Sequence, residues 1–152
     1  MSQQRWRLDG QLALVTGGSA GIGRAIAREL LGFGARVLIA ARDGNGLDAV
    51  RIELEEEFPD GEVRTCVADV ADDEQRRELL DWVEDIGDGL NILVNNAGGN
   101  LTKAAIDYSE DEWRGIFEVN LFSAFELARS TYPLLTKHAA SCIVNVGSVS
   151  AI

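Results

Sequence analysis

The chain has 152 residues, of which 46% are hydrophobic and 26% are charged, and its formal net charge at pH 7 is −11. This length and composition are typical of one globular domain, here residues 1–152, and no apolar run approaches the ~18 residues of a membrane span. The acidic balance opposes nonspecific binding to nucleic acids and to anionic membranes. A polar start without a signal-like apolar segment, and only two cysteines, place the protein in the reducing cytoplasm.

Short apolar runs alternate with segments of helical periodicity along the chain. This alternation predicts parallel strands joined by four crossover helices. The strands are expected in five apolar stretches, at residues 11–16, 35–41, 63–68, 90–95 and 141–147. The right-handed crossover rule orders them 3-2-1-4-5, which is an α/β fold with a Rossmann-type doubly wound parallel sheet. Its ligand crevice is expected at the switch point between the first and fourth strands.

Two short patterns predict where the third and fourth helices begin. Asp72 is followed three residues later by Gln75, and Ser109 by Glu112, and both pairs resemble capping boxes. The second pair should open one long helix. Asn120 falls among apolar residues of that helix, so its amide needs partners if it is buried there.

The glycine-rich segment 16–23 follows the first apolar run and opens a helix-like stretch. A strand that turns into a helix leaves backbone N–H groups free at the helix N-terminus, where they and the helix dipole attract a pyrophosphate. Gly17 suits the turn geometry, Gly21 leaves room for the anion, and Gly23 allows close packing of the helix. We therefore predict a dinucleotide site whose residues in this segment are Gly17, Ser19, Gly21, Ile22 and Gly23.

Five motifs in order, namely residues 16–23, 69–70 and 95–98, Asn120 and Ser148, resemble the short-chain dehydrogenase/reductase family. Residues 5–10, 90–98 and 107–108 further resemble its tropinone-reductase-like branch. The resemblance spans essentially all of the chain. It implies a small-molecule carbonyl or alcohol substrate and a homo-oligomer, dimer or tetramer, in the complete form.

The residues after the second strand bear on the choice of cofactor. An NAD enzyme places an acid there to accept hydrogen bonds from the ribose, whereas this chain has Ala41 followed by Arg42. Ala41 removes the repulsion of a 2′-phosphate, and the Arg42 guanidinium can bind that phosphate. NADP(H) is favoured over NAD(H). The alternative is a solvated Arg42 paired with Asp43, and many NADP-using relatives carry a basic residue where this chain has Ala20.

Family resemblance assigns three further groups of residues. The Asp69 carboxylate, with Val70, would bind adenine, although capping of the next helix is an alternative for Asp69. Asn96, Ala97 and Gly98 would lie along the cofactor, while Asn95 braces the sheet.

Two candidate catalytic residues also come from the resemblance. Asn120 would hold a water of a proton relay, with simple bracing as the alternative. Ser148 would hydrogen-bond the substrate carbonyl oxygen, with Ser150 as its nearest rival.

The family's general acid is a tyrosine in a Tyr-x-x-x-Lys pair, expected about a dozen residues after Ser148. Tyr108 and Tyr132 have Glu112 and Thr136 at the lysine position, so neither matches. By this resemblance the last two strands and two helices of the family fold are missing as well, so the chain is expected to be a fragment that is inactive alone. Two cysteines and one histidine make no metal-ligand cluster.

The resulting prediction is an NADPH-dependent carbonyl reductase or alcohol dehydrogenase. The alternative is a non-catalytic NADP(H)-binding module or redox sensor. A methyltransferase is disfavoured because Ala41 occupies the place of its usual acid. A P-loop NTPase is disfavoured because the Gly-Lys-Ser/Thr ending is missing.

Overall fold

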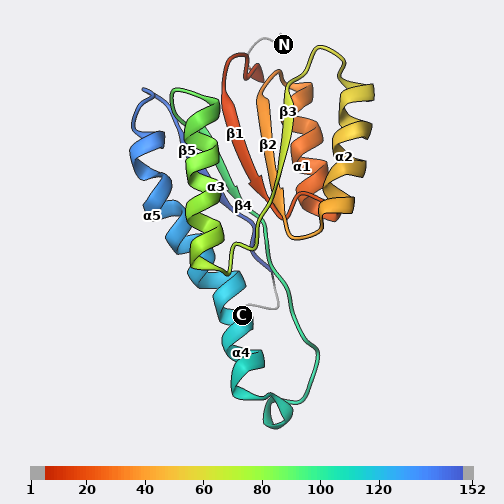
Figure 1. Ribbon diagram of the computed structural model, residues 1–152, viewed down its shortest axis with the longest axis vertical. Coiled ribbons are helices and arrows are strands. Elements are labelled where there is room, and N and C mark those ends of the chain that lie inside the picture. The colour runs from red at the N-terminus through yellow and green to blue at the C-terminus, as the bar shows by residue number, and fades with distance from the viewer. Residues whose placement is uncertain (1–5, 149–152) are drawn as a thin grey trace.

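The computed structural model describes residues 6–148, which form a parallel β-sheet with helices on both faces. The sheet has five strands in the order β3-β2-β1-β4-β5 (Figure 1), as the sequence predicts. All four strand pairs are parallel. The strands are β1 (Leu12–Thr16), β2 (Arg36–Ala41), β3 (Val63–Val67), β4 (Ile92–Asn95) and β5 (Cys142–Asn145).

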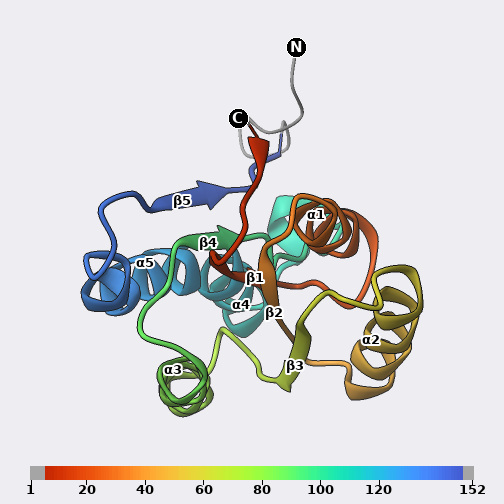
Figure 2. The ribbon, with the colours of Figure 1, turned by 90° about the horizontal axis from the view of Figure 1, so that it is seen from above.

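The helices divide between the two faces of the sheet. They are α1 (Gly21–Gly32), α2 (Gly44–Glu57), α3 (Asp73–Ile86), α4 (Glu110–Phe117) and α5 (Ser123–Leu135), with a short 3₁₀ helix η2 (Ala105–Asp107) and a π-helical segment η3 (Glu118–Phe122). Helices α1 and α2 cover one face, and α3 and α5 cover the other (Figure 2). This arrangement is the doubly wound α/β fold.

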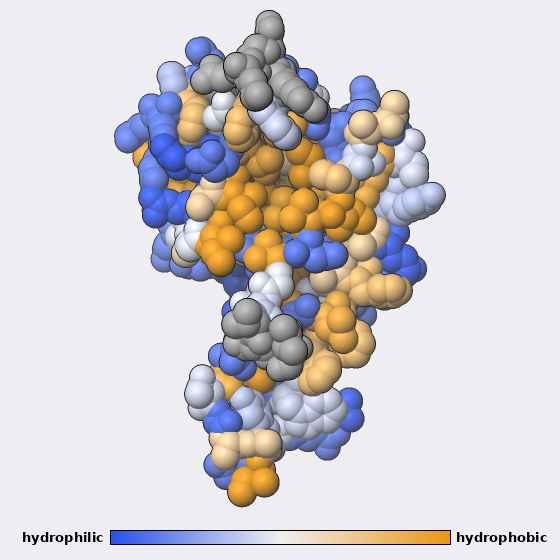
Figure 3. Space-filling model, turned by 180° about the vertical axis from the view of Figure 1, so that it is seen from behind, coloured by the Kyte–Doolittle hydropathy of each residue, from blue (hydrophilic) through white to orange (hydrophobic). Residues whose placement is uncertain are grey.

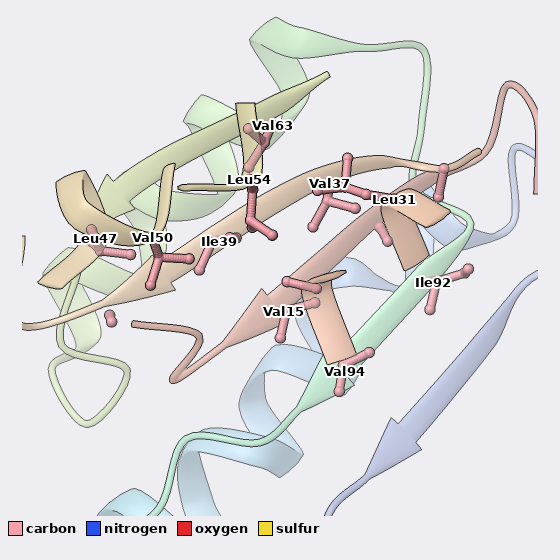
Figure 4. Packing of buried hydrophobic residues seen from close by; sticks show 14 residues of the cluster. Val15, Leu31, Val37, Ile39, Leu47, Val50, Leu54, Val63, Ile92 and Val94 are labelled. Atoms are coloured by element: carbon pink, nitrogen blue, oxygen red, sulfur yellow. The ribbon is translucent and has the colours of Figure 1, made fainter. Parts of the chain in front are cut away.

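Strands β1, β2 and β4 contribute side chains to two hydrophobic cores, because successive residues point to opposite faces. Val15 and Ile39 belong to the core beneath α1 and α2 (Figure 4), whereas Leu14 and Leu38 belong to the core beneath α3 and α5. All four side chains are almost fully buried. The central strands are therefore rigid, and they fix the positions of the loops that follow them.

The fourth helix differs from its prediction. Ser109 and Glu112 form the expected capping box, but the segment that follows consists of α4, η3 and α5 rather than one regular helix. Asn120 lies in η3 and is exposed, so the expectation of an amide surrounded by core residues is wrong. Leu121, beside it, is 54% exposed. Helix α4 and the loop before it extend beyond the carboxyl edge of the sheet (Figure 1), where there is no core to cover these residues.

Strand β5 is exposed along its whole length. Ile143, Val144 and Val146 are 39%, 44% and 36% exposed, respectively. Figure 2 places β5 on the side of the molecule that faces away from the viewer in Figure 1, and Figure 3 shows a broad hydrophobic area on that side. Contiguous exposed apolar surface of this kind is typical of interaction sites.

Candidate functional site

The glycine-rich turn joins β1 to α1 at the switch point of the sheet. Gly17 has φ 66° and Gly21 has φ 55°, so both positions need the left-handed conformation that glycine adopts without strain. A Cβ on Gly23 would lie 2.4 Å from both the Asn96 Nδ2 and the Gly17 carbonyl oxygen. Gly23 therefore lets the helix pack closely, as predicted, although the contact is with the turn and Asn96.

The N-terminus of α1 has the features of an anion site. No described side chain caps it, and its first turn contains no acidic residue. The position above Gly21 is open, since a Cβ there would meet no atom within 4 Å. Because the first amides of a helix have no intrahelical partner, these N–H groups are directed at whatever occupies the space.

Thr16, the last residue of β1, holds the turn against β4. Its side chain is buried, and its Oγ1 accepts hydrogen bonds from the backbone N–H groups of Asn96, at 3.1 Å, and Ala97, at 3.0 Å. It also donates to the Val94 carbonyl at 3.3 Å. The sequence analysis missed this role. A hydroxyl residue that ends an otherwise apolar strand is the signal that could have revealed it.

A cleft of about 390 Å³ runs beside this turn. Eight of the predicted binding residues line it, namely Gly17, Ser19, Ala41, Arg42, Asp69, Val70, Ala97 and Gly98, and the other lining residues are Ala40, Asp43, Ala68 and Val119. The carboxyl ends of β1, β2, β3 and β4 thus meet at one site, as expected for parallel strands. Ile22, at the rim of the turn, is 64% exposed.

Arg42 and Asp69 face each other at the cleft. Ala41 is buried at the end of β2, while the next side chain, Arg42, is 73% exposed and lies with Nη1 3.7 Å from Asp69 Oδ2. The alternative partner in the prediction, Asp43, is not the one seen. An exposed arginine held by one long ion pair is free to take another anion, because such pairs contribute little.

The loop that carries Asp69 is fixed by the start of α3. The backbone N–H of Asp69 donates to Gln75 Oε1 at 2.9 Å, and Asp69 Oδ1 accepts from the Ala71 N–H at 2.9 Å. Capping of α3 is performed by Asp72, which accepts from Glu74 and Gln75. The carboxylate of Asp69 is therefore not the helix cap, and one of its oxygens remains directed at Arg42.

The two asparagines at the end of β4 have different partners. Asn95 Nδ2 donates to Asn145 Oδ1 at 2.9 Å and to the Ala124 carbonyl at 3.2 Å, so Asn95 braces β5 and α5. Asn96 Nδ2 donates to the carbonyls of Thr16, at 2.9 Å, and Gly17, at 3.1 Å. The Asn96 amide thus holds the glycine turn, a contact that the sequence analysis did not foresee.

Asn120 reaches the loop after β4 from the other side. Its Oδ1 accepts from the Gly99 N–H at 3.2 Å, and its Nδ2 donates to the Gly99 carbonyl at 2.7 Å and to the Ile116 carbonyl at 2.8 Å. A Cβ on Gly98 would lie 2.7 Å from Asn120 Oδ1, so this approach requires glycine. The structure therefore brings Asn120 together with Gly98, two predicted site residues.

Ser148 follows the carboxyl end of β5, the parallel neighbour of β4, and is exposed. Ser150 lies outside the described residues. Neither tyrosine lines the cleft. The Tyr108 hydroxyl donates a hydrogen bond to the Leu101 carbonyl, and Tyr132, on α5, is 65% exposed.

Within residues 6–148, no group of three or more histidine, cysteine or acidic side chains is placed to hold a metal. Burial raises the pKa of the Cys66 thiol in β3, with Glu78 adding to the effect, so this thiol stays protonated and is a poor nucleophile. The described helices include none long and apolar enough to cross a membrane.

Comparisons with known proteins agree with this geometry. A family model described as short chain dehydrogenase matches residues 11–152. A tropinone reductase homolog from Arabidopsis thaliana is 41% identical over 152 residues, which cover 99% of this chain and 56% of the relative. Senescence-associated protein 13 from the same plant is 39% identical, and the match covers 97% of this chain and 55% of the relative.

Solved structures are similar as well. Pseudomonas aeruginosa RhlG, in an active-site complex with NADP, matches with a TM-score of 0.89 and 35% identity over 97% of this chain and 58% of that chain. L-Sorbose reductase from Gluconobacter frateurii, complexed with NADPH and L-sorbose, matches with a TM-score of 0.92 and 29% identity. The match covers 97% of this chain and 56% of that chain. The chain thus spans slightly more than half the length of the relatives that it matches.

Proposed function

The chain belongs to the short-chain dehydrogenase family, and from that premise we propose that it binds NADP(H) as the cofactor-binding part of an oxidoreductase. The proposed reaction is the transfer of a hydride between the nicotinamide and a ketone or secondary alcohol. The observation that carries this proposal is the uncapped N-terminus of α1 beside the open position at Gly21. The backbone N–H groups at this helix N-terminus form a site that fits a pyrophosphate.

The residues present fit a dinucleotide along the whole cleft. The turn from Gly17 to Gly23 would hold the pyrophosphate through backbone N–H groups and the dipole of α1. Asp69 and Val70 would flank the adenine, whose amino group suits an ionised carboxylate that only accepts hydrogen bonds. Ala97 and Gly98 would lie along the ribose on the nicotinamide side, where Thr16 holds Ala97 and Asn120 holds the adjacent Gly99.

The preference for NADP(H) over NAD(H) rests on the end of β2. Ala41 offers no carboxylate to repel a 2′-phosphate, and the exposed Arg42 offers a guanidinium within reach of the cleft. The similar structures of RhlG and L-sorbose reductase contain NADP and NADPH, respectively, which supports the same choice here.

When bound, the reduced nicotinamide would supply the hydride. Ser148 would donate a hydrogen bond to the substrate carbonyl oxygen and stabilise the charge that develops there. Asn120 would hold a water molecule of the proton relay, in addition to its observed role of bracing Gly99. A proton donor in a Tyr-x-x-x-Lys pair would complete the reaction, because a nearby lysine lowers the tyrosine pKa.

The proposal includes a homo-oligomer for the complete form and the cytoplasm as the compartment. The exposed apolar residues of α5 and β5 support association with further polypeptide. The acidic net charge supports a small-molecule substrate rather than nucleic acid as the partner.

The test is a titration of the 152-residue chain with NADPH and NADH, followed by assays of NADPH oxidation with a panel of ketones. The 152-residue chain should bind NADPH weakly and should not oxidise it with any of the ketones. A form extended through any downstream Tyr-x-x-x-Lys should be active. Failure of both forms to bind a dinucleotide would refute the proposal. Binding without turnover by the extended form would favour the alternative, a redox sensor.

A further inference from the structure

One guanidinium is buried beside the cleft, in the first turn of α3. The Arg76 side chain is 7% exposed, although its neighbour Arg77 lies in solvent. Burial of a charged group is costly unless the group is paired and hydrogen-bonded. The partners of Arg76 should therefore explain why an arginine occupies this position.

The first partner belongs to the adenine side of the cleft. Arg76 Nη1 donates to the Val70 carbonyl at 2.5 Å, while Nη2 binds Asp73. Val70 lines the cleft, and the adjacent Asp69 is held by Gln75. Two neighbouring side chains of α3 thus fix the backbone on both sides of the Asp69–Val70 peptide.

The second partner belongs to the opposite side. Arg76 Nη1 lies 3.8 Å from Oε1 of Glu118, the first residue of η3. The next residue, Val119, lines the cleft, and Asn120 binds Gly99. One buried cation therefore contacts two segments that each contribute to the lining of the cleft.

Packing of α3 does not require this charge. Leu79 and Val83, on the same face of the helix, are 1% and 0% exposed, and Asp72 caps the N-terminus. An apolar side chain would pack against Leu79 without the desolvation cost of a guanidinium. The Arg76 guanidinium, however, has several N–H donors and can contact a carbonyl and two carboxylates at once, which no apolar side chain can do.

We propose that Arg76 is a positioning residue that holds the adenine-side loop and η3 at a fixed separation and thereby sets cofactor affinity. The identity of the ligand rests on the proposed function, whereas the effect on the two segments does not. Glu118 is the second member of this link. Arg77 is the matched control, because Arg77→Met removes the same charge one residue away on the exposed face.

The first experiment uses NMR to measure amide hydrogen exchange in the chain without ligand. Arg76→Met should speed exchange at Asp69 and Ala71 and also at Gly99, by about 10-fold or more, as expected when hydrogen bonds to a charged group are lost. Arg77→Met should leave all three amides unchanged. Glu118→Gln should speed exchange at Gly99 alone. This variant provides the test if Arg76→Met does not fold.

The second experiment compares NADPH with 2′,5′-ADP, which occupies only the adenine half of the site. Arg76→Met should weaken binding of both, whereas Glu118→Gln should weaken NADPH and spare 2′,5′-ADP. Faster exchange confined to α3, or equal effects of Arg77→Met, would overturn the positioning role. If the unmodified chain bound neither ligand, the proposed function would fail, and the exchange data would still decide the role of Arg76.

Discussion

Arg42 and Asp69 form an ion pair across the dinucleotide cleft, with 3.7 Å between Nη1 and Oδ2. The two residues end up together because β2 and β3 are parallel neighbours and both chains leave the sheet at the same edge. The pair places an exposed cation beside a carboxylate that would face adenine. In the proposed function, cofactor preference would depend on whether Arg42 binds the 2′-phosphate or Asp69.

Replacement of Arg42 by alanine should weaken NADPH binding about 10- to 150-fold and hardly change NADH binding, because only NADPH carries the 2′-phosphate. Titration of the intact chain with both dinucleotides measures this difference. Arg51→Ala is the control, since Arg51 pairs with Glu55 on α2 and lines no part of the cleft. Equal losses for NADPH and NADH would reject the assignment of Arg42.

Replacement of Gly23 by alanine should destabilise the fold by about 1–3 kcal/mol and weaken dinucleotide binding, because the new Cβ would collide with Asn96 Nδ2 and the Gly17 carbonyl. Gly115→Ala is the opposite case. Gly115 is in α4, and a Cβ there meets no atom within 4 Å, so this change should stabilise by about 0.5–1 kcal/mol. Urea unfolding curves of the two variants should move in opposite directions, and a shift of both in the same direction would contradict the packing argument.

The Arg36–Glu62 pair should make stability depend on acid pH. Arg36 Nε lies 2.6 Å from Glu62 Oε2, and this hydrogen bond holds the pKa of Glu62 below its ordinary value. A lowered carboxyl pKa stabilises the fold above the unfolded pKa of about 4.3, and the contribution is lost as pH falls through the lower folded pKa.

Glu62→Gln should accordingly lower the unfolding free energy at pH 7 by about 0.5–1 kcal/mol, the range of partly exposed ion pairs. The difference in unfolding free energy between the variant and the unmodified chain should disappear below about pH 4. Thermal unfolding followed by circular dichroism across pH 3–7 measures it, with Glu56→Gln on the exposed side of α2 as the control. A gap that is constant with pH would mean that the pair is not its source.

Ser148→Ala, in a form extended through any downstream Tyr-x-x-x-Lys, should lower turnover about 100- to 1,000-fold with cofactor affinity preserved. Ser150→Ala should have little effect. Steady-state kinetics with NADPH and a ketone separate kcat from binding. A larger loss from Ser150→Ala would show that the active serine is two residues further along the chain.

The strand order and the glycine turn could be predicted because each depends on local pattern: apolar runs, their spacing, and glycines at a strand-to-helix turn. Positions that depend on contacts between distant segments could not. The direction of the Asn96 amide is set by carbonyls about 80 residues earlier in the chain. Likewise, helical spacing places Arg76 on the buried face with Leu79 and Val83, but no sequence signal predicts its ion pair with the distant Glu118.

The π-helical segment η3 limits how this part of the chain can vary in length. Its wider turn contains one residue more than the regular helix needs, and Asn120, which lies in this turn, donates a hydrogen bond to the Gly99 carbonyl. Deletion of one residue would replace the wide turn by regular helix and change the direction of Asn120, while α4 and α5 would keep nearly the same relation about the helix axis. In homologous chains, substitutions of the exposed Leu121 and Phe122 should therefore be far more frequent than insertions or deletions within residues 118–122.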